Sequence, residues 1–75
     1  MTGLPGLRRL MTDYKRQSGR DIVQIRVSHR VPADHCYAGR FNGGPHEVVL
    51  GEDARDRLLG PRTRAFGVPV IEEAP

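Results

Sequence analysis

The first apolar positions of the chain recur at intervals of three and four residues, which is the spacing of one face of an α-helix. These positions are Leu4, Leu7, Leu10, Met11 and Tyr14. Pro5 is compatible with a helix because proline is tolerated in the first turn. The pattern predicts a short amphipathic helix that ends at Ser18-Gly19, where the periodicity stops and the chain can form a hinge.

From Ile22 onward the apolar period changes to two. Val23, Ile25 and Val27 alternate with polar residues, which predicts a strand with these three side chains on one buried face. We expect the other elements to complete a core against this face. The residues expected opposite it are Val49, Leu58, Leu59 and Val70.

The pattern next predicts a hairpin and a second helix. Extended segments at 36–41 and 47–50 flank Asn42-Gly43-Gly44-Pro45, a strong turn sequence, and therefore predict a β-hairpin. Residues 52–59 have the apolar spacing of a short helix, with acidic residues in its first turn and Gly60-Pro61 at its end.

These elements predict an α+β fold. We expect a small single domain over residues 21–75, with a short antiparallel or mixed sheet, one short helix and a last extended segment over residues 68–71. Residues 1–20 precede this domain as a basic amphipathic arm or helix. The hinge at Ser18-Gly19 predicts that the domain folds without the arm.

Size and composition restrict the classes of function. The chain has 75 residues, of which 37% are hydrophobic, and it contains no tryptophan. A chain of this length buries only about 60% of the surface that its unfolded form exposes. The sequence therefore predicts marginal stability in isolation and a partner that completes the burial. It does not favour an independent enzyme.

The sequence also indicates the compartment. The single cysteine, Cys36, cannot form an internal disulfide, which is typical of a reducing environment. No apolar run approaches the roughly 20 residues that span a bilayer. The N-terminus lacks the uninterrupted apolar segment of a signal peptide. We therefore expect no membrane partner.

The net positive charge of the chain comes from its first 20 residues. This segment has five basic residues against one acidic residue, a formal charge of +4, whereas residues 21–75 have seven arginines against eight carboxylates, a charge of −1. Such asymmetry predicts that the arm docks on an acidic surface of a protein or on nucleic acid. The candidate partner-binding residues are Leu7, Arg8, Arg9, Leu10, Met11, Tyr14, Lys15 and Arg16.

Side chains that could bind metal or catalyse a reaction are present but poorly spaced. The possible zinc ligands are His29, His35, Cys36 and His46. Only His35 and Cys36 are close in sequence, and adjacent strand residues face opposite sides. Asp34-His35-Cys36 has the residue types of a catalytic triad, yet three consecutive residues cannot easily converge. We expect no catalytic, metal or cofactor-binding residues, and we expect Cys36 to be a small buried hydrophobic residue.

From Ile22 to Ile71 the sequence resembles the N-terminal domain family of the FluMu proteins of Mu-like prophages, which are small proteins of phage head-gene clusters. The residues that carry this resemblance are Ala38-Gly39, Phe41, Gly44-Pro45, Glu47-Val48-Val49-Leu50, Leu58-Leu59, Pro61-Arg62 and Val68 to Ile71. Two positions depart from the family pattern: Tyr37 stands where the family usually has arginine, and Pro32-Ala33-Asp34-His35 replaces a glycine-aromatic step. The basic leader has no counterpart in the family, and we expect no second C-terminal domain in this protein.

The resemblance implies a small α+β phage protein without established catalytic residues. We therefore expect a bacteriophage virion protein, a minor capsid or cementing subunit that binds the head shell through its N-terminal arm and a sheet edge. Its partners would be the major capsid protein or other virion subunits, with further copies of itself possible within the assembly. It would be located in the phage head, and in the host cytoplasm during assembly.

Two other classes of function remain open from the sequence. A basic accessory phage protein would bind nucleic acid through residues 1–20, and its affinity would depend steeply on salt. Tyr14 is the only aromatic residue in this segment, so a stacking platform for single strands is poorly supported. A small inhibitor of a host protein would use an exposed strand edge.

Overall fold

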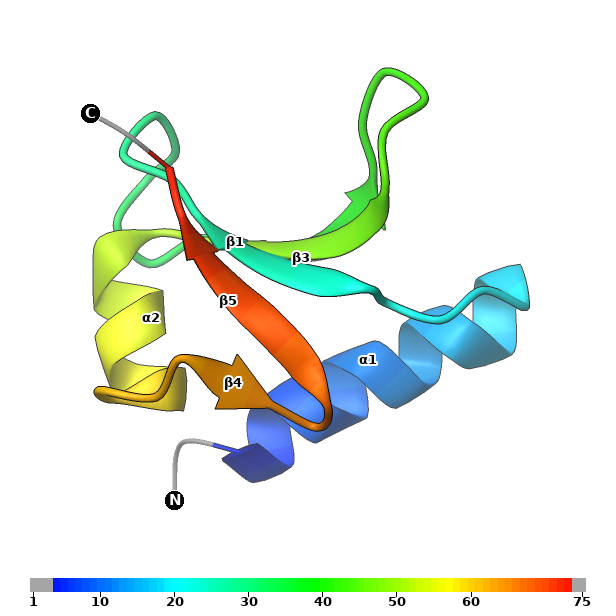
Figure 1. Ribbon diagram of the computed structural model, residues 1–75, viewed down its shortest axis with the longest axis horizontal. Helices are drawn as coiled ribbons and strands as arrows, with labels where there is room; N and C mark the ends of the chain where they lie inside the picture. The colour runs from blue at the N-terminus through cyan, green and yellow to red at the C-terminus, as the bar shows by residue number, and fades with distance from the viewer. Residues whose placement is uncertain (1–3, 74–75) are drawn as a thin grey trace.

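The structure is a computed structural model, which describes residues 4–73 and the side chains of residues 6–73. This part of the chain forms two helices and five strands (Figure 1). They are α1 (Leu4–Ser18), β1 (Gln24–Val27), β2 (Cys36–Arg40), β3 (His46–Leu50), α2 (Glu52–Leu59), β4 (Arg64–Ala65) and β5 (Val68–Glu72). The predicted α+β class, a short helix beside a mixed sheet, is confirmed. No helix in residues 4–73 is long and apolar enough to cross a membrane.

The five strands form one sheet in the order β2-β3-β1-β5-β4. The central strand β1 runs parallel to β3 and to β5, so that Ile25 lies between Val48 and Val70. Strands β2 and β3 form the antiparallel hairpin that the sequence predicts. The two-residue strand β4 was not expected, because so short a segment has no alternation to detect.

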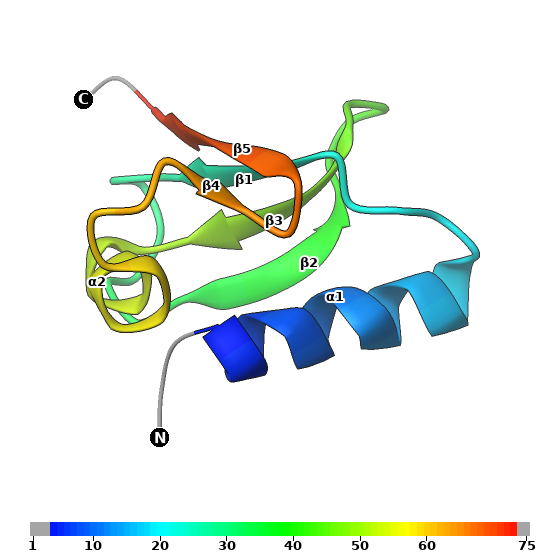
Figure 2. The same ribbon diagram turned by 60° about the horizontal axis from the view of Figure 1, so that its bottom comes forward.

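The hydrophobic core lies between the sheet and the two helices. Its buried members are Leu7, Ile22, Ile25, Val48, Leu50, Ala54, Leu58, Leu59 and Ala65. Figure 2 shows α1 running along the sheet, and Leu7 of this helix is 0% exposed. The division into a separate arm and a domain is therefore corrected, since the helix supplies a core residue to the fold.

The predicted buried face of β1 is correct for Ile25 and Val27 and wrong for Val23. Val23 is 52% exposed, and Ile22 is buried in its place. Alternation holds only inside the regular strand, which begins at Gln24, and residues 20–23 have no regular structure.

Val49 is buried, at 3% exposure, but it lies on the face opposite the core. In the sheet register Val49 is the neighbour of Arg26 on β1 and of Tyr37 on β2. Because side chains at paired positions share a face, Val49 belongs with these two residues rather than with Ile25. Its predicted position opposite the core face of β1 is corrected.

Candidate functional site

The apolar side chains at positions 7, 10, 11 and 14 of α1 pack mainly against the core of the domain. Leu7 is fully buried, and Leu10, Met11 and Tyr14 are partly buried against the core. The Tyr14 hydroxyl is also hydrogen-bonded to Nδ1 of His46 on β3, at 2.5 Å. Leu7 is therefore unavailable to a partner while the fold holds, and the other three side chains present only part of their surface.

The basic residues of α1 are exposed. Lys15 Nζ lies 3.0 Å from the Asp21 carboxylate, and Arg16 lies 3.8 Å from Asp13. Within residues 6–73 no carboxylate lies within ion-pair distance of Arg8 or Arg9. Exposed ion pairs contribute only about 0–1 kcal/mol each. The charged side of α1 is thus the part of the predicted binding segment that faces solvent.

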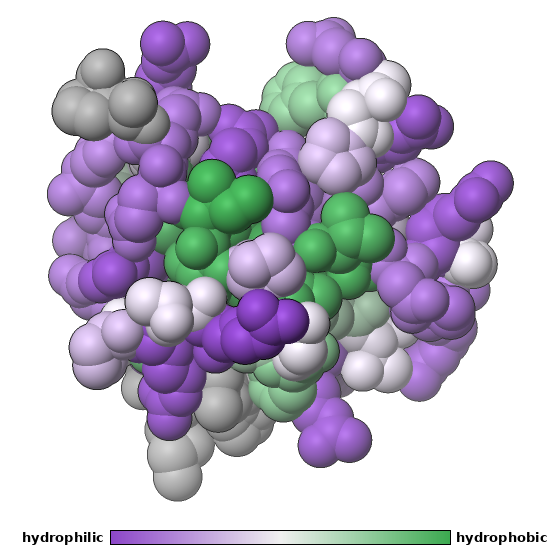
Figure 3. All heavy atoms as spheres, viewed as in Figure 1, coloured by the Kyte–Doolittle hydropathy of each residue, from purple (hydrophilic) through white to green (hydrophobic). Residues whose placement is uncertain are grey.

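The sheet face opposite the helices, here called the open face, carries a shallow cavity. Figure 1 shows the loop after β1 and the tip of the β2–β3 hairpin rising at opposite ends of the sheet. Between them lies a trough of about 390 Å³. Its lining includes Arg26, Val31, His35, Tyr37, Phe41 and Val49. In Figure 3, which has the view of Figure 1, hydrophobic atoms lie in groups near the middle of the molecule and are surrounded by hydrophilic ones.

Two aromatic side chains of this trough are well exposed, Tyr37 at 45% and Phe41 at 58%. The Tyr37 ring lies over Gly39, where a Cβ atom would clash with the tyrosine ring and hydroxyl oxygen. The His35 ring lies 5.9 Å from the Tyr37 ring, measured between centroids. Large aromatic side chains held in this way at the surface are typical of contact sites.

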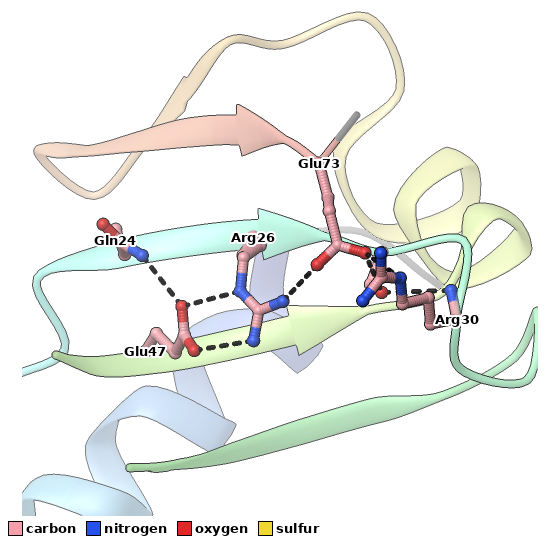
Figure 4. Close-up of polar contacts among 6 residues, drawn as sticks. Gln24, Arg26, Arg30, Glu47 and Glu73 are labelled. Carbon is pink, nitrogen blue, oxygen red and sulfur yellow. Dashed lines mark hydrogen bonds and ion pairs between the residues drawn. The ribbon is translucent and has the colours of Figure 1, made fainter. Parts of the chain in front are cut away.

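A cluster of charged and polar side chains crosses the open face (Figure 4). Arg26 donates two hydrogen bonds to Glu47, with Nη2 2.9 Å from Oε2 and Nε 3.1 Å from Oε1. Gln24 Nε2 donates to the same carboxylate at 2.8 Å. Arg26 Nη1 also donates to Glu73 at 2.5 Å, and the Ser28 hydroxyl donates to this carboxylate at 2.8 Å. In Figure 4 part of α1 is seen behind the sheet, and these side chains stand in front of it.

The electrostatics of this cluster are those of a satisfied ion-pair network. The hydrogen bonds from Arg26, followed by that from Gln24, lower the pKa of Glu47 against the opposing effect of its burial. The hydrogen bond from Ser28, together with the one from Arg26, lowers the pKa of Glu73. Glu47 in turn raises the pKa of Arg26. These groups remain charged at neutral pH and join β1, β3 and the end of β5 to one another.

The histidines and the cysteine lie apart. His29 pairs with Glu52, His35 lies beside Tyr37, and His46 is bonded to Tyr14. In the described residues no three His, Cys, Asp or Glu side chains are grouped so that they could hold a metal ion.

Cys36 is exposed, and its predicted burial is wrong because it lies on an edge strand. Partial burial around the thiol nevertheless raises its pKa, and Arg57 opposes this shift to a smaller degree.

The exposure of three apolar residues was not predicted from the sequence. Phe41 was assigned only to the end of a strand, and neither Phe66 nor Ile71 was expected at the surface. Phe66 could have been found from its neighbour. Phe66-Gly67 connects the two strands of a hairpin, a position where Asn-Gly is the usual pair.

Comparisons with models of protein families, with curated proteins and with solved structures gave no match to this chain. The resemblance to the FluMu N-terminal domain family therefore stays a prediction.

Proposed function

We propose that this chain is a structural subunit of a bacteriophage head, a minor capsid or cementing protein that acts by binding neighbouring subunits and has no catalytic role. The sequence resemblance supplies the phage context. The exposed apolar side chains of the surface support binding to neighbouring protein subunits.

One observation carries this proposal. The chain has only two phenylalanines and two tyrosines, and three of these four, Tyr37, Phe41 and Phe66, are exposed. A domain with so small a core would gain stability by burying them, since a fully buried large apolar side chain contributes about 1.5–3 kcal/mol. Their exposure supports a partner that covers them, and aromatic residues are enriched in interface centres.

The trough on the open face is the main contact surface in this proposal. Its apolar floor and wall, Val49, Tyr37 and Phe41, would receive a side chain of a shell subunit. Within residues 4–73 the adjacent edge strand β2 pairs with another strand only on its β3 side, and its free edge would add main-chain hydrogen bonds. Many symmetric copies of one such site on a shell would bind many copies of this chain.

The test is quantitative mass spectrometry of particles purified from the host that carries this gene. The proposal predicts that the chain copurifies with intact heads in a fixed molar ratio to the major shell subunit, and that the ratio survives repeated density-gradient centrifugation. A chain that is absent from the particles, or present at a ratio that falls with every gradient, would refute it.

A second function, nucleic-acid binding, is favoured by the exposed Arg8 and Arg9 on α1, which have no carboxylate partner within residues 6–73. It ranks lower because Asp13 and Asp21 lie among the same cations. Measuring DNA affinity against salt separates the two functions. A binding protein that neutralises several phosphates loses affinity steeply as salt rises, whereas the virion subunit is expected to bind duplex DNA weakly.

A further inference from the structure

The turn between β4 and β5 holds a phenylalanine in an unfavourable backbone conformation. Its two central residues, Phe66 and Gly67, have φ values of 51° and 80°. This left-handed region suits glycine and asparagine and is uncommon for a bulky residue. The chain adopts similar values at Asn42 and Gly43, 50° and 73°, where the sequence has the favoured pair.

Core packing does not compensate for this conformation. Phe66 is 45% exposed and is not a member of the hydrophobic core cluster. A costly backbone conformation that leaves the ring outside the core cluster and nearly half exposed points to a use of the side chain outside the fold.

The Phe66 ring forms one wall of a cleft of about 580 Å³. In Figure 1 the β4–β5 turn is seen next to α1, and residues of both line the cleft. Met11, Ile22 and Val68 supply the other apolar walls of this cleft. Arg8 and Lys15, from α1, are the cations of its lining, and the one carboxylate there, Asp21, is already paired with Lys15. The cleft is thus apolar inside and positive at its margin.

We propose that this cleft docks an acidic amphipathic segment of a partner protein. An apolar side chain of that segment would pack between Phe66 and Met11, and a carboxylate of the segment would pair with Arg8. Charge complementarity selects an acidic partner, because Arg8 has no carboxylate partner in residues 6–73.

A nucleic acid fits this cleft less well than a protein segment. Among the described residues of this lining Phe66 alone is aromatic, so successive bases of a strand would have no series of aromatic faces on which to stack. The site is distinct from the trough on the open face, and its assignment does not depend on the phage proposal.

The test uses the isolated protein. A random peptide library is selected on the wild-type chain with counter-selection on Phe66→Asn, and synthetic copies of the enriched peptides are then titrated. We expect these peptides to combine Asp or Glu with a large apolar residue. We expect them to bind Phe66→Asn about tenfold or more weakly than wild type. Arg8→Glu should weaken binding as well, whereas Phe41→Asn, an exposed aromatic of the trough, should leave it unchanged.

Thermal melting shows whether a loss of peptide binding by Phe66→Asn results from a loss of folding. Phe66→Asn should melt at the same temperature as wild type or higher, because asparagine tolerates the positive φ. The proposal is overturned if that variant melts lower, which would show that the ring serves the fold. It is also overturned if no Phe66-dependent peptide is enriched, if the enriched peptides lack acidic residues, or if a single-stranded oligonucleotide binds wild type and loses its binding in Phe66→Asn.

Discussion

Replacing Leu7 by alanine tests whether α1 belongs to the fold. Leu7 is fully buried within the core cluster that also contains Ile25, Leu58 and Leu59. Truncation of an enclosed leucine costs about 2–5 kcal/mol, because the lost transfer free energy adds to the cost of the cavity. Alanine has the higher helix propensity, so the helix itself loses nothing. We expect a loss of about 3 kcal/mol in the free energy of unfolding.

That loss is large for a domain of this size. Native proteins are stable by roughly 0.05–0.15 kcal/mol per residue, which gives about 4–11 kcal/mol for this chain. Urea unfolding followed by far-ultraviolet circular dichroism measures the difference from the midpoint and slope. Arg9→Ala, an exposed position on the same helix, serves as the control and should stay within about 0.5 kcal/mol of wild type.

A loss below about 1 kcal/mol for Leu7→Ala would refute the placement of α1 in the core. The same placement reverses the expectation that residues 21–75 fold alone. A chain that starts at Asp21 lacks Leu7, and we now expect it to unfold without a cooperative transition.

Three further predictions concern the sheet and its edge. Ile25→Ala should lower the free energy of unfolding by about 2–5 kcal/mol, whereas Val23→Ala should change it by less than about 0.5 kcal/mol. Equal losses in urea titrations would contradict the burial of Ile25 and the exposure of Val23. Because its folded pKa is lowered, Glu47 contributes stability that is fully present above the ordinary glutamate pKa of about 4.3 and is lost as pH falls through the lowered pKa. Urea midpoints should therefore fall with pH below about 4, with a weaker dependence in Glu47→Gln, and an unchanged pH dependence in that variant would contradict the network. The raised pKa of Cys36 predicts alkylation at neutral pH that is slower than that of an unstructured thiol and accelerates on unfolding in urea, whereas equal rates would exclude the partial burial of the thiol.

The local pattern of the sequence predicted every element except β4, but it did not predict which faces of the strands are buried in the core. Period-two alternation located β1, and the turn at Asn42-Gly43 located the hairpin. Alternation cannot tell which side of a strand the helices cover. Residues 47–50 of β3 are all buried, so this strand has no exposed face to mark its orientation. Val49 was therefore assigned to the wrong side.

The candidate site was predicted only in part, for a related reason. An amphipathic helix has one apolar face whether it packs on its own domain or on a partner, and the sequence of α1 contains nothing that distinguishes the two cases. Only the folded structure shows Leu7 enclosed and Arg8 exposed. Phe66 was missed because the importance of a residue in a turn depends on its φ, which the structure supplies.

The most direct test of the proposed function is a competition for incorporation into phage heads. Wild type and the double variant Tyr37→Ser, Phe41→Ser are expressed together, and their ratio in purified particles is compared with their ratio in the lysate by mass spectrometry. Val23→Ser, an exposed apolar position that does not line the trough, is the matched control. Strong depletion of the double variant from the particles, with Val23→Ser incorporated like wild type, is the predicted result. Particles that contain the double variant at its lysate ratio, or that contain neither form, would contradict the proposal.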